Sequence, residues 1–306
     1  MTTRRYILKT LAATSLLAGL PLASRAQSGL TSTALGASLT LISGAGANVV
    51  VAQGTDSVVV VNGGLQANAE ALLAEINTLT GNKPISALFN TSFRPEFCGL
   101  NYLLGPQGTK IIAHENTRLW QNAGFYADWQ NTQYEPMPKA AQANETFYTS
   151  GSLALDGETI DYGFISQANS DGDIYVHFKN ADVLVAGNML GSDSYILLDY
   201  VTGGWIGGAQ KTTAGLLARA TDNTKVIAAN GGVLGKSQLQ EQADMLVHAY
   251  DRVSWAFQNG KSLEEFQAAD PMKDFRARWG DPTLFLALLY KSTWYRVPGR
   301  AVKNVV

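Results

Sequence analysis

The sequence contains only one cysteine and three histidines in 306 residues. Because Cys98 stands alone, no disulfide can form within the chain, even in an oxidising compartment. His114 follows an apolar run, His177 lies inside a predicted strand and His248 lies inside a predicted long helix. We therefore predict structural roles for all three histidines rather than roles as metal ligands.

Charge is also scarce, since charged residues make up 16% of the chain and the net charge is −2. This balance gives no reason to expect nucleic acid or an anionic membrane surface as a partner. Hydrophobic residues make up 46% of the sequence, and it contains no internal repeat or block of like charge. Length and composition together predict one sizeable domain with a large core.

The N-terminus has the features of a bacterial export signal. Residues 3–9, TRRYILK, resemble the twin-arginine motif, and a mildly apolar run follows at residues 11–22. Cleavage after Ala26 divides the chain into a signal peptide at 1–26 and a mature domain at 27–306. The alternatives are an ordinary secretory signal and an uncleaved anchor, but the run is short for a membrane span. We expect a periplasmic protein with no stable membrane span after cleavage.

Short apolar runs rich in β-branched residues predict two groups of strands. The first group lies at residues 39–42, 49–52, 58–61 and 86–89, and the second at 151–155, 159–165, 174–178, 183–186 and 225–228. Helices are predicted at residues 67–79, 207–220, 236–259 and 282–291. This order of strands and helices predicts an α+β fold.

The most informative segment is the loop at residues 90–101, NTSFRPEFCGLN, which follows a short apolar strand. Its frame resembles the zinc-binding loop of the metallo-β-lactamase superfamily, which reads T-H-x-H-x-D-H, then a small residue, G-G-N and a helix. Thr91, Gly99 and Asn101 keep their places in this frame. The aspartate position holds Glu96, and the three histidine positions hold Ser92, Arg94 and Phe97.

Four further segments resemble the other site-forming segments of that superfamily, in the same order along the chain. Residues 168–173 resemble A-H-T-x-G-D, and residues 181–188 resemble A-D-V-x-x-x-G-D, the segment with the metal-bridging carboxylate. Residues 229–232 resemble the late G-H-G loop, and residues 58–64 resemble the V-D-x-G strand end. At the four key positions of these segments the chain has asparagine: Asn169, Asn188, Asn230 and Asn62.

The resemblance covers about residues 37–290, including a tail at 262–280 that is similar to exported members. It implies a four-layer αββα sandwich with C-terminal helices, in which loops at one edge of two sheets form the site. Zinc binding requires imidazoles and carboxylates that converge on one point. Asparagines keep the shape and hydrogen bonding of the lost ligands without their charge. The resemblance therefore implies a neutralised, metal-free cleft that needs no cofactor.

Arg94 and Glu96 are the charged exceptions in this set. As neighbours of opposite sign, they pair within the pocket on one interpretation and fill the space left by the metal. On the other interpretation they form a solvated surface pair of little energetic consequence.

Three functions remain open. The preferred one is a pseudoenzyme, a non-zinc binding or partner protein whose cleft holds a small molecule or a periplasmic protein. The second is a retasked metal-independent hydrolase or lyase, with Arg94 or asparagine amides on an oxyanion, Glu96 as general base, and Ser92 or Cys98 as nucleophile. The third is a hydrolase with a non-standard, oxygen-only metal site at Glu96, Asp171 and Asp173. The second lacks an evident base for Ser92, and the family frame already explains Asp173.

Two features near this loop have more than one interpretation. Cys98 lies at a predicted helix start, where a thiol is either an activated nucleophile or a small packed residue, and we favour packing. An irregular stretch between the two halves of the chain is rich in aromatic residues that either line a ligand pocket or pack onto the body. These residues are Trp120, Phe125, Tyr126, Trp129, Tyr134, Phe147 and Tyr148.

Overall fold

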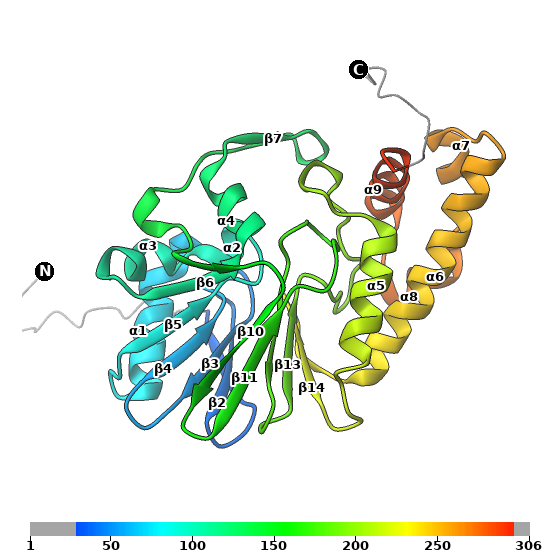
Figure 1. Cartoon of the computed structure of the whole chain (residues 1–306). Helices are drawn as coiled ribbons and strands as arrows, with labels where there is room; N and C mark the ends of the chain where they lie inside the picture. The colour runs from blue at the N-terminus through cyan, green and yellow to red at the C-terminus, as the bar shows by residue number, and fades with distance from the viewer. Residues whose placement is uncertain (1–28, 297–306) are drawn as a thin grey trace, which may run out of the picture.

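The computed structural model describes residues 29–296, so the export signal predicted at 1–26 lies outside the described residues. Two β-sheets lie face to face, and helices cover the outer face of each sheet (Figure 1). A small two-stranded hairpin lies above one edge of the sheets. Among residues 29–296, no helix has both the length and the apolar character that a membrane span requires.

The first sheet has seven strands in the order β1-β2-β3-β4-β5-β6-β9. Its first four strands pair antiparallel, and β4, β5, β6 and β9 pair parallel. The strands are β1 (Thr31–Ala34), β2 (Leu39–Ser43), β3 (Val49–Gln53), β4 (Val58–Val61), β5 (Ile85–Phe89), β6 (Lys110–His114) and β9 (Glu145–Phe147).

The second sheet has six strands in sequence order, and only β13 and β14 pair parallel. Its strands are β10 (Ser150–Leu155), β11 (Glu158–Gly163), β12 (Tyr175–Phe178), β13 (Val183–Gly187), β14 (Lys225–Ala228) and β15 (Val233–Leu234). The separate hairpin is formed by β7 (Phe125–Ala127) and β8 (Thr132–Tyr134), within the aromatic-rich stretch.

The helices fall into two outer layers (Figure 1). On the first sheet lie α1 (Ala69–Thr80), α2 (Pro95–Cys98), α3 (Asn101–Leu104) and α4 (Glu115–Asn122). The second layer contains α5 (Ile206–Leu217), α6 (Lys236–Gln258), α7 (Leu263–Ala268), α8 (Arg276–Trp279) and α9 (Thr283–Trp294). The helix predicted at 67–79 begins two residues later because residues 66–68 form a 3₁₀ turn.

Alternation along the strands divides the core into layers, because successive side chains of a strand point to opposite faces. In β13, Val185 joins the cluster between the two sheets, whereas Leu184 joins the cluster under α5, α6 and α9. In β4, Val59 and Val61 face the second sheet, and Val60 faces the outer layer with α1. The predicted four-layer αββα sandwich is therefore confirmed.

The parallel strand pairs decide where the site forms. The carboxyl ends of β4 and β5 lie together, since Val61 is paired with Phe89. In the second sheet, Gly187 at the end of β13 is paired with Ala228 at the end of β14. The residues that follow these four ends are the segments singled out in the sequence.

Candidate functional site

Asn62 supports the site from behind and does not line it. This buried residue follows β4 with a φ of 69°, a left-handed conformation that asparagine tolerates better than most residues. Its Oδ1 accepts hydrogen bonds from the Thr91 backbone N–H (3.2 Å) and hydroxyl (2.8 Å), and its Nδ2 donates to the Asn48 carbonyl (3.1 Å). Asn62 thereby fixes the start of the loop that carries Arg94.

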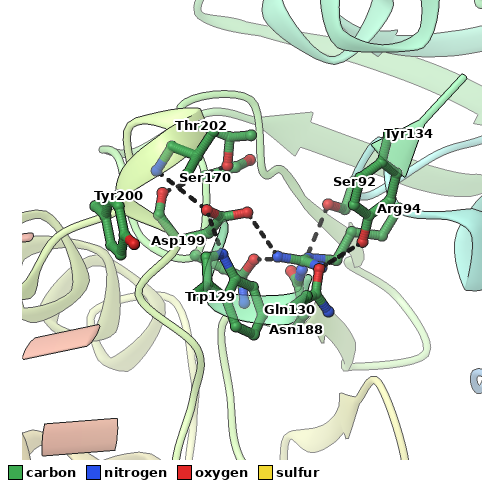
Figure 2. Close-up of polar contacts among 12 residues, drawn as sticks. Ser92, Arg94, Trp129, Gln130, Tyr134, Ser170, Asn188, Asp199, Tyr200 and Thr202 are labelled. Carbon is green, nitrogen blue, oxygen red and sulfur yellow. Dashed lines mark hydrogen bonds and ion pairs between the residues drawn. The ribbon is translucent and has the colours of Figure 1, made fainter. Parts of the chain in front are cut away.

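Arg94 is buried at the centre of the site and forms an ion pair with Asp199 (Figure 2). Its Nη2 lies 2.8 Å from Asp199 Oδ2, and the two side chains are only 3% and 1% exposed. Arg94 Nε donates to Asn169 Oδ1 at 3.2 Å. Arg94 and Asn169 both stand at predicted zinc-ligand positions, and the Arg94 guanidinium joins the two loops that carry them.

The remaining atoms of the guanidinium also have partners. Nη1 donates to the Tyr134 hydroxyl (3.2 Å) and approaches Gln130 Oε1 (3.5 Å), and Cζ lies 5.4 Å from the centre of the Trp129 ring. Trp129 Nε1 in turn donates to Asp199 Oδ1 at 2.9 Å (Figure 2). The hairpin region therefore closes over the ion pair.

The backbone holds Asp199 beside Asn169. The Asp199 N–H donates to the Asn169 carbonyl (3.0 Å), and the Gly204 N–H donates to the Asp199 carbonyl (2.7 Å). A Cβ at Gly204 would lie 2.1 Å from the Asn169 carbonyl oxygen, so the two loops can approach this closely only with glycine there. The close approach of the two loops places Asp199 opposite Arg94, although Asp199 lies 105 residues further along the chain.

The expected pairing of Arg94 with Glu96 is wrong, because Arg94 pairs with Asp199 instead. Pro95 begins the short helix α2, and Glu96 in its first turn is half-buried, whereas Arg94 before it is buried. Their neighbouring positions in sequence therefore do not place the two side chains against each other. Asp199 and Gln130 complete the arrangement without having been predicted as site residues, and Trp129 belongs to the predicted aromatic stretch.

A polar cleft of about 150 Å³ lies beside the ion pair. Among its lining residues are Arg94, Glu96, Asn169, Asn188 and Asn230, together with the segment at 190–197. Five of the eight predicted positions thus come together in one cleft. Two buried polar atoms of the lining residues, Asn188 Oδ1 and the Tyr195 hydroxyl, have no hydrogen-bond partner in the described part of the chain.

Ser92 and Phe97 are buried next to this cleft and are not among its lining residues. The Ser92 hydroxyl accepts from Asn188 Nδ2 at 3.4 Å (Figure 2). Phe97 packs with Ala47 and Cys98 in a small apolar cluster. Phe97 therefore occupies a histidine position as a core residue.

A larger aromatic chamber of about 440 Å³ adjoins the polar cleft, and Arg94, Glu96 and Leu197 line both. Of the seven aromatic residues between the two halves, only Trp120 and Tyr134 line this chamber. Phe125 stacks behind Tyr134 with ring centres 4.8 Å apart, and Phe147 packs against His114 and Tyr162. Both interpretations of the aromatic stretch therefore hold, each for different residues.

These residues do not fit a dinuclear zinc site, although the sequence keeps the frame of one. The cleft presents a buried guanidinium and neutral amides where zinc needs imidazoles and carboxylates. Within residues 29–296, no three histidine, cysteine, aspartate or glutamate side chains form a group that could hold a metal ion. Asp171 instead accepts from Trp120 Nε1 (2.7 Å), and Asp173 from the Ser170 N–H (2.5 Å), so Glu96, Asp171 and Asp173 form no common donor group.

The thiol of Cys98 is a packed group. Burial raises its pKa to about 12, although a hydrogen bond from Gln121 acts in the opposite direction. Its Sγ lies 3.5 Å from the Ser92 carbonyl and 3.4 Å from Gln121 Nε2. The predicted position of Cys98 at a helix start is also wrong, because Cys98 is the last residue of α2, so an activated cysteine nucleophile has no support here.

The histidines make structural contacts. His114 caps α4, because its Nδ1 accepts from the Asn116 N–H (3.1 Å), and its Nε2 lies 3.1 Å from the Tyr148 carbonyl. His177 is buried in β12, and His248 Nε2 lies 2.8 Å from the Pro271 carbonyl. None of them belongs to the polar cleft or the aromatic chamber.

The solved structures that are similar in fold to this chain include metallo-β-lactamases. A metallo-β-lactamase from Pontibacter korlensis matches 71% of this chain and 99% of its own, with 16% identity and a TM-score of 0.57. The DIM-1 metallo-β-lactamase matches 72% of this chain and 98% of its own chain, with 15% identity and a TM-score of 0.57. The IND-7 metallo-β-lactamase matches 72% of this chain and 98% of its own chain, with 17% identity and a TM-score of 0.56.

No protein-family model matches the sequence, and no curated protein matches it either. The likeness to solved structures therefore defines the fold. The chain has the metallo-β-lactamase fold, and the positions of the zinc ligands are taken by other residues.

Proposed function

We propose that this chain is an exported pseudoenzyme of the metallo-β-lactamase fold, a binding protein whose former zinc cleft takes a small molecule without metal. The buried Arg94–Asp199 ion pair carries the proposal. Breaking such a pair leaves an uncompensated buried charge, so the pair is a fixed part of the fold. A cleft built around a fixed cation has lost the chemistry of a dication site.

The linings of the two cavities support binding. The polar cleft offers the side-chain amides of Asn169, Asn188 and Asn230 to a polar ligand group. The adjoining chamber offers apolar and aromatic surface. An apolar cavity with a few polar groups at one end has the features of a small-molecule site.

The test is a pair of measurements on the mature protein. Hydrolysis of a chromogenic β-lactam is measured with and without added zinc, and we expect no turnover above that of an unrelated protein. A thermal-shift screen of small molecules is then repeated on Asn188→Ala, which we expect to reduce the shift of any ligand in the polar cleft. Zinc-dependent β-lactam turnover would overturn the proposal.

A second candidate is a metal-independent hydrolase or lyase with Glu96 as general base. Glu96 favours it, because this half-buried acid lines both cavities and would reach a ligand in either. Ser92 is fully buried, and the Cys98 thiol is held in its neutral form, so neither is a suitable nucleophile. If turnover of any substrate is found, Glu96→Gln should abolish it, and unchanged turnover excludes this role.

Export to the periplasm is part of the proposal and rests on the twin-arginine pattern at residues 3–9. The test is fractionation of cells that express the full chain, followed by N-terminal sequencing of the periplasmic protein. We expect a start at Gln27 and loss of export when Arg4 and Arg5 are both changed to lysine. Export that persists in this variant would exclude the twin-arginine route.

A further inference from the structure

The aromatic chamber is larger than the polar cleft, and its lining combines aromatic rings with acids. Phe93, Trp120 and Tyr134 line it together with Met137, and two acidic residues, Glu96 and Glu135, are also among its lining residues. The three rings form a connected cluster, with Phe93 6.1 Å from both Trp120 and Tyr134. Aromatic faces and carboxylates are the two kinds of group that attract an organic cation.

The only basic residue in this lining is Arg94, and its charge is compensated within the protein. Asp199 lies 2.8 Å from its Nη2, and the Arg94 side chain is only 3% exposed. Glu96 and Glu135, in contrast, form no ion pair with any residue in the range 29–296. The balance of uncompensated charge in the chamber is therefore negative.

The placement of Glu96 strengthens this point. Burial raises the pKa of Cys98 and of Tyr134, and Glu96 raises both further, although the Gln121 hydrogen bond at Cys98 and the Arg94 charge at Tyr134 act more strongly in the opposite direction. Tyr134 and Cys98 both line the aromatic chamber. A ligand cation within reach of Glu96 would be attracted to this carboxylate, which has no ion-pair partner among residues 29–296.

We propose that the aromatic chamber binds a small organic cation, a protonated or quaternary amine with an apolar body. The cationic group lies between the rings and Glu96, and a polar substituent extends toward Asn169 and Asn188 in the adjoining cleft. This inference rests on the proposed function as a metal-free binding protein and adds the charge class of the ligand. It is a specific choice, because the metal-free cleft alone would equally admit a neutral or anionic ligand.

The experiment compares three probes with the same ring by isothermal titration calorimetry: benzyltrimethylammonium, 2-phenylethanol and phenylacetate. We expect the cation to bind about tenfold more tightly than the neutral alcohol, which corresponds to about 1.4 kcal/mol. Glu96→Gln and Trp120→Leu should each weaken the cation about fivefold or more and change binding of the alcohol less. The matched control is Asp251→Asn on the exposed face of α6, which should change nothing.

Glu96→Gln preserves shape, so it keeps the test valid if Trp120→Leu unfolds, and thermal melts identify that case. Equal or tighter binding of phenylacetate, binding of none of the three probes, or an unchanged affinity in Glu96→Gln overturns the cation inference. A zinc titration of the same preparation separates this failure from failure of the proposed function. Stoichiometric zinc binding contradicts the metal-free binding protein, whatever the probes do.

Discussion

Replacing Arg94 by methionine should destabilise the fold strongly. Methionine keeps much of the apolar stem, but it leaves Asp199, 1% exposed, without its cation. Removing one partner of a buried ion pair typically costs about 3–5 kcal/mol. For a domain of this size about 1 kcal/mol lowers the melting temperature by roughly 2–4 °C, so we expect a decrease of roughly 6–20 °C.

The assay is urea unfolding followed by circular dichroism, with the melting temperature as a second readout. A second substitution, Asp199→Asn, in the Arg94→Met background should recover part of the loss. The asparagine removes the buried charge and keeps an oxygen that accepts a hydrogen bond from Trp129 Nε1. In the native protein this nitrogen lies 2.9 Å from Asp199 Oδ1. The double variant therefore separates the cost of an unpaired charge from the cost of lost packing.

A matched control is Arg276→Met, because Arg276 forms an ion pair of similar length with Asp270 (2.9 Å) at the surface. The side chains of that pair are 48% and 40% exposed, and surface pairs contribute about 0–1 kcal/mol. If Arg94→Met costs no more than Arg276→Met, the ion pair is not a fixed part of the site and the reasoning fails.

Two further predictions concern buried titratable groups. Because burial raises the pKa of Cys98 to about 12, iodoacetamide at pH 8 should not modify the folded protein and should modify it fully in denaturant; rapid modification of the folded protein would contradict this. Burial also lowers the pKa of His114 from its usual 6.5. As the pH decreases, the unfolded state therefore binds the His114 proton before the folded state does, and the free energy of unfolding falls below about pH 6.5. His114→Asn keeps a helix-capping oxygen and should flatten that part of the curve of unfolding free energy against pH; an unchanged curve would exclude His114 as its cause.

The apolar strands could be predicted closely because β-branched apolar runs are locally encoded, whereas the short strands β1, β7, β8, β9 and β15 were not predicted. The strands predicted at residues 58–61 and 225–228 are confirmed, and the others differ by one or two residues at their ends. The asparagine positions could also be found from the sequence, because their segments keep the order and spacing of the family frame. Asn169, Asn188 and Asn230 do meet in one cleft.

The contacts that decide the chemistry could not be predicted in the same way. Asp199 lies 105 residues from Arg94, and nothing in the local pattern distinguishes it from a surface acid beside a turn. Glu96, two residues from Arg94, was the natural partner in sequence, but the geometry at Pro95 separates them. A pairing between distant loops depends on how the two sheets pack, which a local pattern does not contain.

The central claim is that the cleft built around Arg94 and Asp199 holds no transition metal. The most direct measurement is elemental analysis of the protein, purified without chelator and again after incubation with zinc, manganese and calcium. We predict clearly less than one ion per chain in every sample. One or two tightly held ions per chain would contradict the account and make Glu96, Asp171 and Asp173 the first ligands to substitute.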